Sequence, residues 1–331
     1  MGLKIPNVKP GDVLDISIGL IPTSKAAARF TGASLSNTLS GTWNDDFTKF
    51  TVGSISGDGS IVMSAAECDG VNFSNLTLGS TFMFGKHQVG SETPWDIEWE
   101  IVHQEDNYQI AQTVQLIDAR AFDTKEASSS DSNRKIYGNN NWKLSNIRQW
   151  LNSDASAGNW YSAQHSADAP PTNANTSYPT GYDTRPGFLY HFTAAQKSAM
   201  MNFDLTLKIP TVDGGGSHIV SQKVFLPTMT QVGLGANEGV AEGTVFNKYN
   251  GVANSVRIRT VHPNADANSG NTNTGFVANT AWMWWLSSCY TTSYHARAVA
   301  SSGGLGYSTA YGGDGALAPC IVLPRSGICP I

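Results

Sequence analysis

Alternating apolar and polar positions predict a pair of strands near residue 100. Ile97, Trp99 and Ile101 are separated by charged residues, and a second alternating stretch begins at Tyr108, after a turn at residues 105–107. Period-two alternation is typical of a strand with one buried face. The short polar connection predicts that the two strands form an antiparallel hairpin.

Residues 1–75 show the same alternation and no helical periodicity. Phe50 and Val52 lie in one alternating stretch, Ile61 opens another, and a run rich in Gly, Ser and Asp separates them. Such runs favour turns. We expect a small β-rich domain here, with a docking or oligomerisation role suggested by position alone, followed by a second domain over residues 76–331.

Two short helices are predicted from capping residues followed by helical spacing. Ser145 precedes Ile147 and Leu151, which lie four residues apart and so share one helical face. Thr193 and Gln196 have the spacing of a capping box before a second helix. Segments 153–186, 211–222 and 262–276 are rich in polar residues, Gly or Pro, and we expect long loops there that border a binding face.

Composition and charge narrow the range of partners. Only 14% of the residues are charged, 33 are Gly, and the net charge is −5, so the chain offers no basic surface for nucleic acid. No apolar run is long enough to span a membrane. Pro6 and Pro10 interrupt the N-terminal segment, which predicts that no signal peptide is present. An extracellular role stays open if the protein leaves the cell inside an assembled particle. We therefore expect no nucleic-acid partner and no membrane insertion.

Residue patterns for catalysis or metal binding do not emerge from the sequence. The seven His residues are scattered without zinc-ligand spacing, and no nucleophile elbow or phosphate loop occurs. Glu98 and Glu100 would share one exposed strand face, and a glycosidase-like carboxylate pair stays open as an alternative. We expect no enzyme, no cofactor and no required metal.

The four cysteines, Cys68, Cys289, Cys320 and Cys329, are too few and too unevenly spaced for a disulfide framework. We expect reduced thiols. A bridge between Cys320 and Cys329 across a terminal hairpin is the alternative.

The sharpest apolar feature is the run from Trp282 to Leu286. It could form an exposed aromatic platform for sugars. Aromatic clusters usually supply core area, so we favour a buried central strand.

An ordered series of motifs over residues 76–326 resembles a known fold. The motifs are LGSTFMFG, IEWEIV, LIDARAFDT, SNIRQWLN, VFLPT, WMWWLSS and GALAPCIVLP. Together they resemble the C-type-lectin-like domains of phage and bacterial surface proteins, which are related in fold to formylglycine-generating enzymes. The resemblance implies an α+β fold of antiparallel strands, two short helices and long loops. Ser287 stands where an Arg is usual, and Leu317 to Pro319 provide the closing motif.

Within that group, the C-terminal part resembles the variable proteins of diversity-generating retroelements. Their randomised asparagine codons cannot yield Lys, Glu, Gln, Trp or Met. None of these five residues occurs from Ser288 to Gly315, although the whole chain contains nine Trp and seven Met. The resemblance implies a variable region over residues 288–314, and an ordinary loop rich in Ser, Gly and Tyr is the alternative.

The resemblance also sorts the positions of this region. Those that correspond to unchanged codons, and so to framework, are Ala296, Arg297, Val299, Leu305, Ala310 and Gly315. Those assigned to ligand binding are Cys289, Tyr290, Thr292, Tyr294, His295, Ala298, Ala300, Ser302, Gly304, Gly306, Tyr307, Ser308, Thr309, Tyr311, Gly312 and Asp314. Their Tyr, Ser and Gly content is typical of antibody paratopes.

The resemblance implies a phage tail-tip or tail-fibre protein that binds a host-surface receptor, either protein or glycan. Such a protein assembles in the host cytoplasm, joins other tail proteins in the virion and forms a homotrimer. A bacterial surface adhesin is the first alternative. An enzyme akin to the formylglycine generators, which would need a reactive cysteine pair, is the second.

Overall fold

The chain divides into two compact units in a computed structural model. One unit contains residues 1–75 together with 326–331, and the other contains residues 76–325. The described residues are 2–5, 13–15, 27–35, 39–43, 49–55, 61–68, 70–89, 93–178, 181–265 and 275–330, with side chains from Gly70 onward apart from Ile328 and Pro330.

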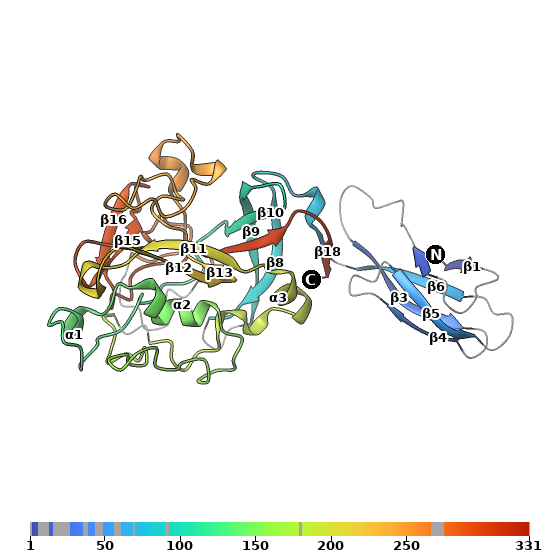
Figure 1. Cartoon of the computed structure of the whole chain (residues 1–331), viewed down its shortest axis with the longest axis horizontal. Helices are drawn as coiled ribbons and strands as arrows, with labels where there is room; N and C mark the ends of the chain where they lie inside the picture. The colour runs from blue at the N-terminus through green and yellow to red at the C-terminus, as the bar shows by residue number, and fades with distance from the viewer. Residues whose placement is uncertain are drawn as a thin grey trace. The chain divides into compact units, whose positions relative to one another are not determined.

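The first unit is built from short antiparallel strands (Figure 1). The strands expected around Phe50 and Ile61 are present, whereas the turn between them lies outside the described residues. One sheet has the order β1-β6-β3 and another the order β2-β5-β4. The strands are β1 Gly2–Ile5, β2 Val13–Asp15, β3 Ala27–Leu35, β4 Leu39–Trp43, β5 Lys49–Ile55 and β6 Ile61–Cys68.

The last residues of the chain belong with this first unit rather than with the second domain, where the sequence had placed them. Strand β18 (Ile328–Pro330) pairs antiparallel with β7 (Gly70–Asn72), and Phe73 N, in the 3-10 helix η1 (Phe73–Asn75), donates to Gly327 O over 2.9 Å. This pairing joins segments far apart in the sequence, which no local pattern reveals.

The second unit has a central five-stranded antiparallel sheet of order β13-β17-β10-β9-β8. In Figure 1 the red strand β17 runs beside the cyan strands of this sheet. The hairpin expected near residue 100 is confirmed, since β9 and β10 pair antiparallel across a short turn. The strands are β8 Thr81–His87, β9 Trp95–Gln104, β10 Tyr108–Thr113, β13 Val224–Phe225 and β17 Cys320–Pro324.

The helices of the second unit are short, and both expected helices are confirmed. Ser145 caps α2 (Asn146–Leu151) by accepting a hydrogen bond from Arg148 N, and Ile147, Trp150 and Leu151 are buried. Thr193 and Gln196 form a complete capping box on α3 (Ala194–Ala199). The remaining helices are α1 Arg134–Tyr137 and the 3-10 helices η2 Trp142–Leu144, η3 Phe188–His191, η4 Thr211–Asp213, η5 Asn247–Tyr249 and η6 Asn254–Arg257.

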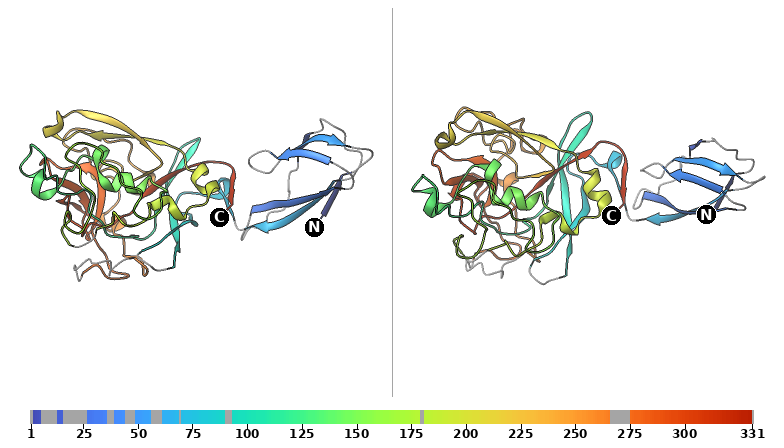
Figure 2. Two further views of the ribbon diagram at one scale, coloured as in Figure 1. Left: turned by 90° about the horizontal axis from the view of Figure 1, so that it is seen from below. Right: turned by 60° about the horizontal axis from the view of Figure 1, so that its bottom comes forward.

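One expected loop is largely regular structure. Residues 211–222 include β12 (Ser217–Gln222), which pairs antiparallel with β11 (Phe203–Lys208) along its whole length. The prediction of a loop was wrong because the glycines before Ser217 resemble a linker. In residues 153–178 and 181–186 the polar segment carries no helix or strand, as both views of Figure 2 show in light green. Part of the third segment, 262–276, lies outside the described residues.

A three-stranded antiparallel sheet of order β14-β15-β16 carries the C-terminal tryptophans. Its strands are β14 Trp284–Cys289, β15 His295–Val299 and β16 Leu305–Thr309. Every residue of β14 is buried, which confirms a buried strand, but β14 lies at one end of its sheet and is not a central strand. Trp282 and Met283 just before it are half-buried. Trp285 Nε1 donates to Arg120 O over 2.9 Å, so the indole polar group is satisfied inside the core.

The second unit is thus of α+β type, with antiparallel sheets, short helices and long irregular segments. In the part of the chain that the structure describes, no helix is long and apolar enough to cross a membrane.

Gly315 allows the chain to pass directly over Trp285. A Cβ atom at residue 315 would lie 1.9 Å from Trp285 Cε2 and 2.0 Å from Nε1, and the indole is fully buried in a close-packed interior.

We predict that Gly315→Ala lowers the free energy of unfolding by about 1–3 kcal/mol, the usual cost of overpacking a core. Chemical unfolding followed by tryptophan fluorescence measures it. Gly306→Ala is the matched control, because a Cβ there makes only ordinary contacts of 3.6 Å or more. Equal stability of the two variants would contradict the packing argument.

Candidate functional site

The candidate site is one face of the hairpin formed by β15 and β16. The strands pair in register from His295 opposite Thr309 to Val299 opposite Leu305. On the buried face Ala296 and Ala298 pack into the core. The opposite face is open enough to carry larger side chains.

Two tyrosines, a histidine and an arginine are in contact on this open face. The rings of Tyr290 and Tyr307 stack with centroids 4.4 Å apart and an interplanar angle of 16°. The Arg297 guanidinium lies 4.3 Å from the Tyr290 centroid, and the His295 ring meets Tyr307 edge-on at 5.0 Å. Leu305 flanks Tyr307 on the same face of β16. We call these five residues the aromatic face.

Tyr307 is the most open member of the aromatic face. Its exposed fraction is 52%, although stacking against Tyr290 restricts its motion. A large, rigid ring that is already ordered loses little conformational entropy on binding. The aromatic face therefore suits contact with a ligand.

A second aromatic group lies next to this face. Tyr294 contacts the rings of both Tyr137 and His295, with centroids 4.9 and 4.2 Å apart. Tyr137 also meets Tyr311 edge-on, and Lys125 Nζ lies 5.5 Å from the Tyr311 centroid. His295 thus connects the two groups.

The structure brings some of the expected contact residues to the surface and buries others. Cys289, Ala298 and Gly312 are buried, so they present no surface in this chain. Because side chains alternate along a strand, Gly306 and Ser308 lie on the face of β16 that points away from Tyr307 and the aromatic face. Exposed or half-buried are Tyr290, Thr292, Tyr294, His295, Ala300, Ser302, Gly304, Gly306, Tyr307, Ser308, Thr309, Tyr311 and Asp314.

Two residues of the aromatic face were expected to be framework. Arg297 is half-buried beside Tyr290, and Leu305 is 40% exposed. Period-two alternation with His295 and Tyr307 would have placed both on this face. Of the other framework positions, Ala296, Val299, Ala310 and Gly315 are all buried.

The loop that carries Tyr290 and His295 is held through its backbone. Asn140 Nδ2 lies 2.6 Å from Thr292 O, 2.8 Å from His295 O and 3.3 Å from Tyr290 O. Asn140 is fully buried. Since carbonyl groups are the same in every residue type, this support does not depend on the side chains of the loop.

Arg134 supports the same loop from the other side. Its Nε donates to Ser293 O over 3.0 Å, while its two terminal nitrogens bond to the carboxylate of Asp213 at 2.7 and 2.9 Å. A bidentate pair of this kind fixes the guanidinium plane. The ion pair with Asp213 therefore orients the Arg134 guanidinium independently of its bond to the loop.

Backbone bonds hold the segment after β16 as well. Tyr311 N donates to Tyr137 O and Asp123 N donates to Ala310 O, both over 2.9 Å. Ser177 pairs with this segment from the long light-green loop, and its N donates to Tyr311 O over 2.8 Å. None of these contacts uses a side chain of residues 310–313.

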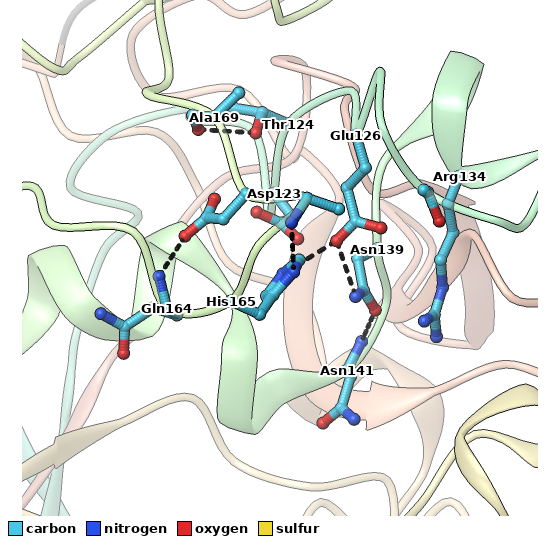
Figure 3. Close-up of polar contacts among 12 residues, drawn as sticks. Asp123, Thr124, Glu126, Arg134, Asn139, Asn141, Gln164, His165 and Ala169 are labelled. Carbon is cyan, nitrogen blue, oxygen red and sulfur yellow. Dashed lines mark hydrogen bonds and ion pairs between the residues drawn. The ribbon is translucent and has the colours of Figure 1, made fainter.

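A buried polar cluster lies behind this support (Figure 3). Asn146 Nδ2 donates to Asp123 Oδ1 over 2.6 Å and to Asp168 Oδ1 over 3.1 Å. His165 Nε2 lies 2.9 Å from Glu126 Oε1, which also accepts from Asn139 Nδ2. Figure 3 shows His165 directed toward Glu126, and Glu126 toward Asn139.

The proton affinities in this cluster are shifted upward. Burial, and after it the charges of Asp168 and Glu126, raise the pKa of the Asp123 carboxyl well above its usual range. Burial also raises the pKa of Asp168, and the hydrogen bond to Glu126 raises the pKa of His165. Each of these groups therefore binds a proton more tightly in the folded chain than in the unfolded one.

The described thiols do not have the properties of reactive cysteines. Cys289 and Cys320 are free thiols, and both are buried, as is Cys329. Burial raises the pKa of the Cys289 thiol to about 12 and that of Cys320 still further. Reactive cysteines have lowered pKa values and open surroundings.

The two carboxylates singled out in the sequence, Glu98 and Glu100, are half-buried residues of strand β9. Glu100 makes an ion pair with Lys248. Among the side chains that the structure describes, no group of three or more His, Cys, Asp or Glu residues is arranged to hold a metal ion.

A polar hollow of about 600 Å³ lies elsewhere in the second unit. Gln88, Asn173, Arg185 and Tyr190 are among its lining residues. None of the expected contact positions lies there, which makes Tyr190 a useful comparison for the tyrosines of the aromatic face.

Comparison with known proteins shows that most of the second unit matches one protein-family model. The model described as "Domain of unknown function (DUF6273)" matches residues 110–325, which is more than half of the chain and includes the aromatic face. No curated protein and no solved structure matches the chain.

We predict that Asn140→Ala lowers the free energy of unfolding by about 1–3 kcal/mol, because partly buried carbonyl groups lose their donor. Hydrogen exchange of residues 290–295 should accelerate more than that of the central sheet. Asn159→Ala is the matched control, since Asn159 is exposed and its side chain bonds to its near neighbours Ser156 and Ala157. Unchanged exchange in the loop would show that Asn140 does not hold it.

We predict that Asp123→Asn gains stability relative to the native chain as pH rises from about 4 to 8. The raised pKa of Asp123 contributes stability below its unfolded value of 3.8 that is lost as pH rises toward the folded value. The Asn variant cannot lose it. Urea unfolding at several pH values measures the difference between the two proteins.

Asp154→Asn is the control of opposite sign for this experiment. The hydrogen bond to Lys197 lowers the pKa of Asp154, so that its contribution is present above its unfolded pKa and lost only as pH falls below about 4. Its difference from the native chain should stay constant between pH 4 and 8. A constant difference for Asp123→Asn would reject the shift.

Proposed function

The chain belongs to the DUF6273 family, and we propose that its second unit is a recognition module that binds a host-surface ligand through the aromatic face. In this proposal the unit has a C-type-lectin-like fold and is not an enzyme. The whole chain is a receptor-binding protein of a phage tail, and it acts in the virion as a homotrimer alongside other tail proteins. Residues 1–75 dock or trimerise.

One observation carries the proposal: residues 290–313 expose large side chains while their backbone is held from elsewhere. Asn140 and Arg134 bond to carbonyl groups of this segment, and Tyr137 and Asp123 bond to its main chain further along. Binding loops need a fixed backbone together with freely chosen side chains. This arrangement provides both.

The chemistry of the exposed side chains also supports recognition. Tyrosine supplies a large amphipathic contact area, and the Arg297 guanidinium beside Tyr290 can bond to a polar or anionic group of a ligand. Thr292 and Thr309 add hydrogen-bonding groups beside His295, at the edge of the aromatic face. An aromatic centre within a polar rim is typical of binding interfaces.

The enzyme alternative has less support. A formylglycine-generating activity would need an accessible cysteine pair, and Cys289 and Cys320 are both buried with raised pKa values. The virion setting depends on the resemblance of residues 76–326. A surface adhesin would use the same aromatic face, so the genomic neighbourhood distinguishes these two settings.

We predict that Tyr290→Ala and Tyr307→Ala each weaken binding to host cells at least about tenfold, as expected when a central aromatic contact is removed. The measurement is flow cytometry of fluorescently labelled full-length protein on a panel of bacterial strains. Tyr190→Ala is the matched control, because Tyr190 is similarly exposed but lies at the polar hollow.

The control variant should bind like the native protein. If no strain binds the native protein, the proposed recognition of a bacterial surface is contradicted. If Tyr190→Ala weakens binding while both variants of the aromatic face do not, the site has been assigned to the wrong surface.

A further inference from the structure

Among the described residues, strand β16 is an outer strand of its sheet and pairs on one side only, with β15. Backbone hydrogen bonds beyond each end of this hairpin fix its pattern. Ala310 N donates to Tyr294 O over 2.7 Å, and Ala300 N donates to Gly304 O over 2.8 Å. Both pairs continue the register of the two strands.

Hydrogen-bonded pairs alternate with non-hydrogen-bonded pairs along an antiparallel ladder. Counting from those two ends, Gly306 and Ser308 bond to β15. Leu305 and Tyr307 therefore turn their backbone N–H and C=O groups outward. No described residue bonds to the outward N–H and C=O groups of Leu305 and Tyr307. At Thr309, the next outward residue, the carbonyl group already accepts a hydrogen bond from Gly312 N.

The two residues that carry these outward groups are exposed. Leu305 and Tyr307 are 40% and 52% exposed. Outward groups of alternate residues recur about every 7 Å along a strand. An extended polypeptide repeats its own donors and acceptors at the same interval, whereas a sugar chain does not.

We propose that β16 receives an extended segment of a protein ligand, which adds a fourth strand to this sheet. The inference rests on the proposed function and names the ligand class of the same site as protein rather than glycan. The outward N–H and C=O groups of Leu305 and Tyr307 pair with the ligand backbone, and the aromatic face contacts its side chains. Strand addition is a recurring mode of peptide recognition.

An apolar border marks one end of this edge. The turn before β16 packs against η6, where a Cβ at Gly303 would meet Asn254 O at 1.8 Å and Ile258 Cγ1 at 3.2 Å. Ile258 and the neighbouring Val256 are both exposed. The added strand should therefore carry apolar or aromatic side chains toward the end that lies near this turn.

A second copy of the chain fits the edge less well than a ligand segment. A strand of five residues is about 17 Å long, and two such strands bury far less than the roughly 1,200 Å² of a stable interface. A ligand segment can add contacts with the aromatic face and with the border at η6. Self-association is therefore an outcome that the test must reject.

The test compares two substitutions at one residue, Tyr307→Ala and Tyr307→Pro, in the full-length protein. Alanine removes the side chain and keeps the outward N–H. Proline also removes that N–H and blocks the edge, but leaves the bonds between β15 and β16 intact. The probe is a bacterial strain that the native protein labels, used untreated, after proteinase K and after periodate.

We expect Tyr307→Pro to bind at least about tenfold more weakly than Tyr307→Ala, because a backbone bond and the approach of the strand are both lost. Proteinase K should abolish labelling and periodate should not. Equal binding by the two variants would overturn the edge proposal while leaving recognition by Tyr307 in place. Labelling that survives the protease and disappears with periodate would show a glycan ligand.

Two further variants keep the result interpretable. Ser308→Pro removes an N–H that bonds to β15, so it should lower the melting temperature, whereas Tyr307→Pro should not. If Tyr307→Pro does not fold, Leu305→Pro replaces it, since proline is tolerated at the first residue of a strand. Native protein that dimerises in light scattering, and loses the dimer with the proline, would assign the edge to self-association.

Discussion

The fixed backbone of residues 290–313 is the constraint on which the recognition surface depends. This segment includes the loop before β15 and the turn after β16, where regular strand pairing gives little support. Asn140 and Arg134 replace that support by bonding to its carbonyl groups. Because these bonds end on main-chain atoms, substitutions at Tyr290, Thr292 or His295 need not disturb them.

The tryptophan core serves the same constraint from beneath. Trp285 is fully buried, bonds to Arg120 O and lies so close to Gly315 that a methyl group would collide with it. Close packing of this kind fixes the position of β14 against the segments that contain Arg120 and Gly315. The alanines on the buried face of β15 fit above that core, so the outward residues are held without contributing to it.

Local interactions account for what the sequence predicted. Interactions between residues close in the sequence determine the β9–β10 hairpin, the cap of α2 and the capping box of α3. The sequence pattern alone therefore predicts these elements. The supports of the site are not local, since Asn140 bonds to residues about 150 positions away. Arg297 and Leu305 were assigned to the framework from codon arguments, whereas alternation along the strands would have placed them on the aromatic face.

The buried cluster around Asp123 shows that holding the backbone of residues 290–313 carries a free-energy penalty. Hydrophobic burial alone does not choose among loop conformations, because many of them hide similar areas, whereas a hydrogen bond to one carbonyl selects one position. Asp123 N bonds to Ala310 O and its carboxyl bonds to Asn146, which joins the end of β16 to α2. The raised pKa of Asp123 reflects the penalty for this buried carboxyl. Stability at neutral pH is therefore exchanged for a single, well-defined backbone beneath the aromatic face.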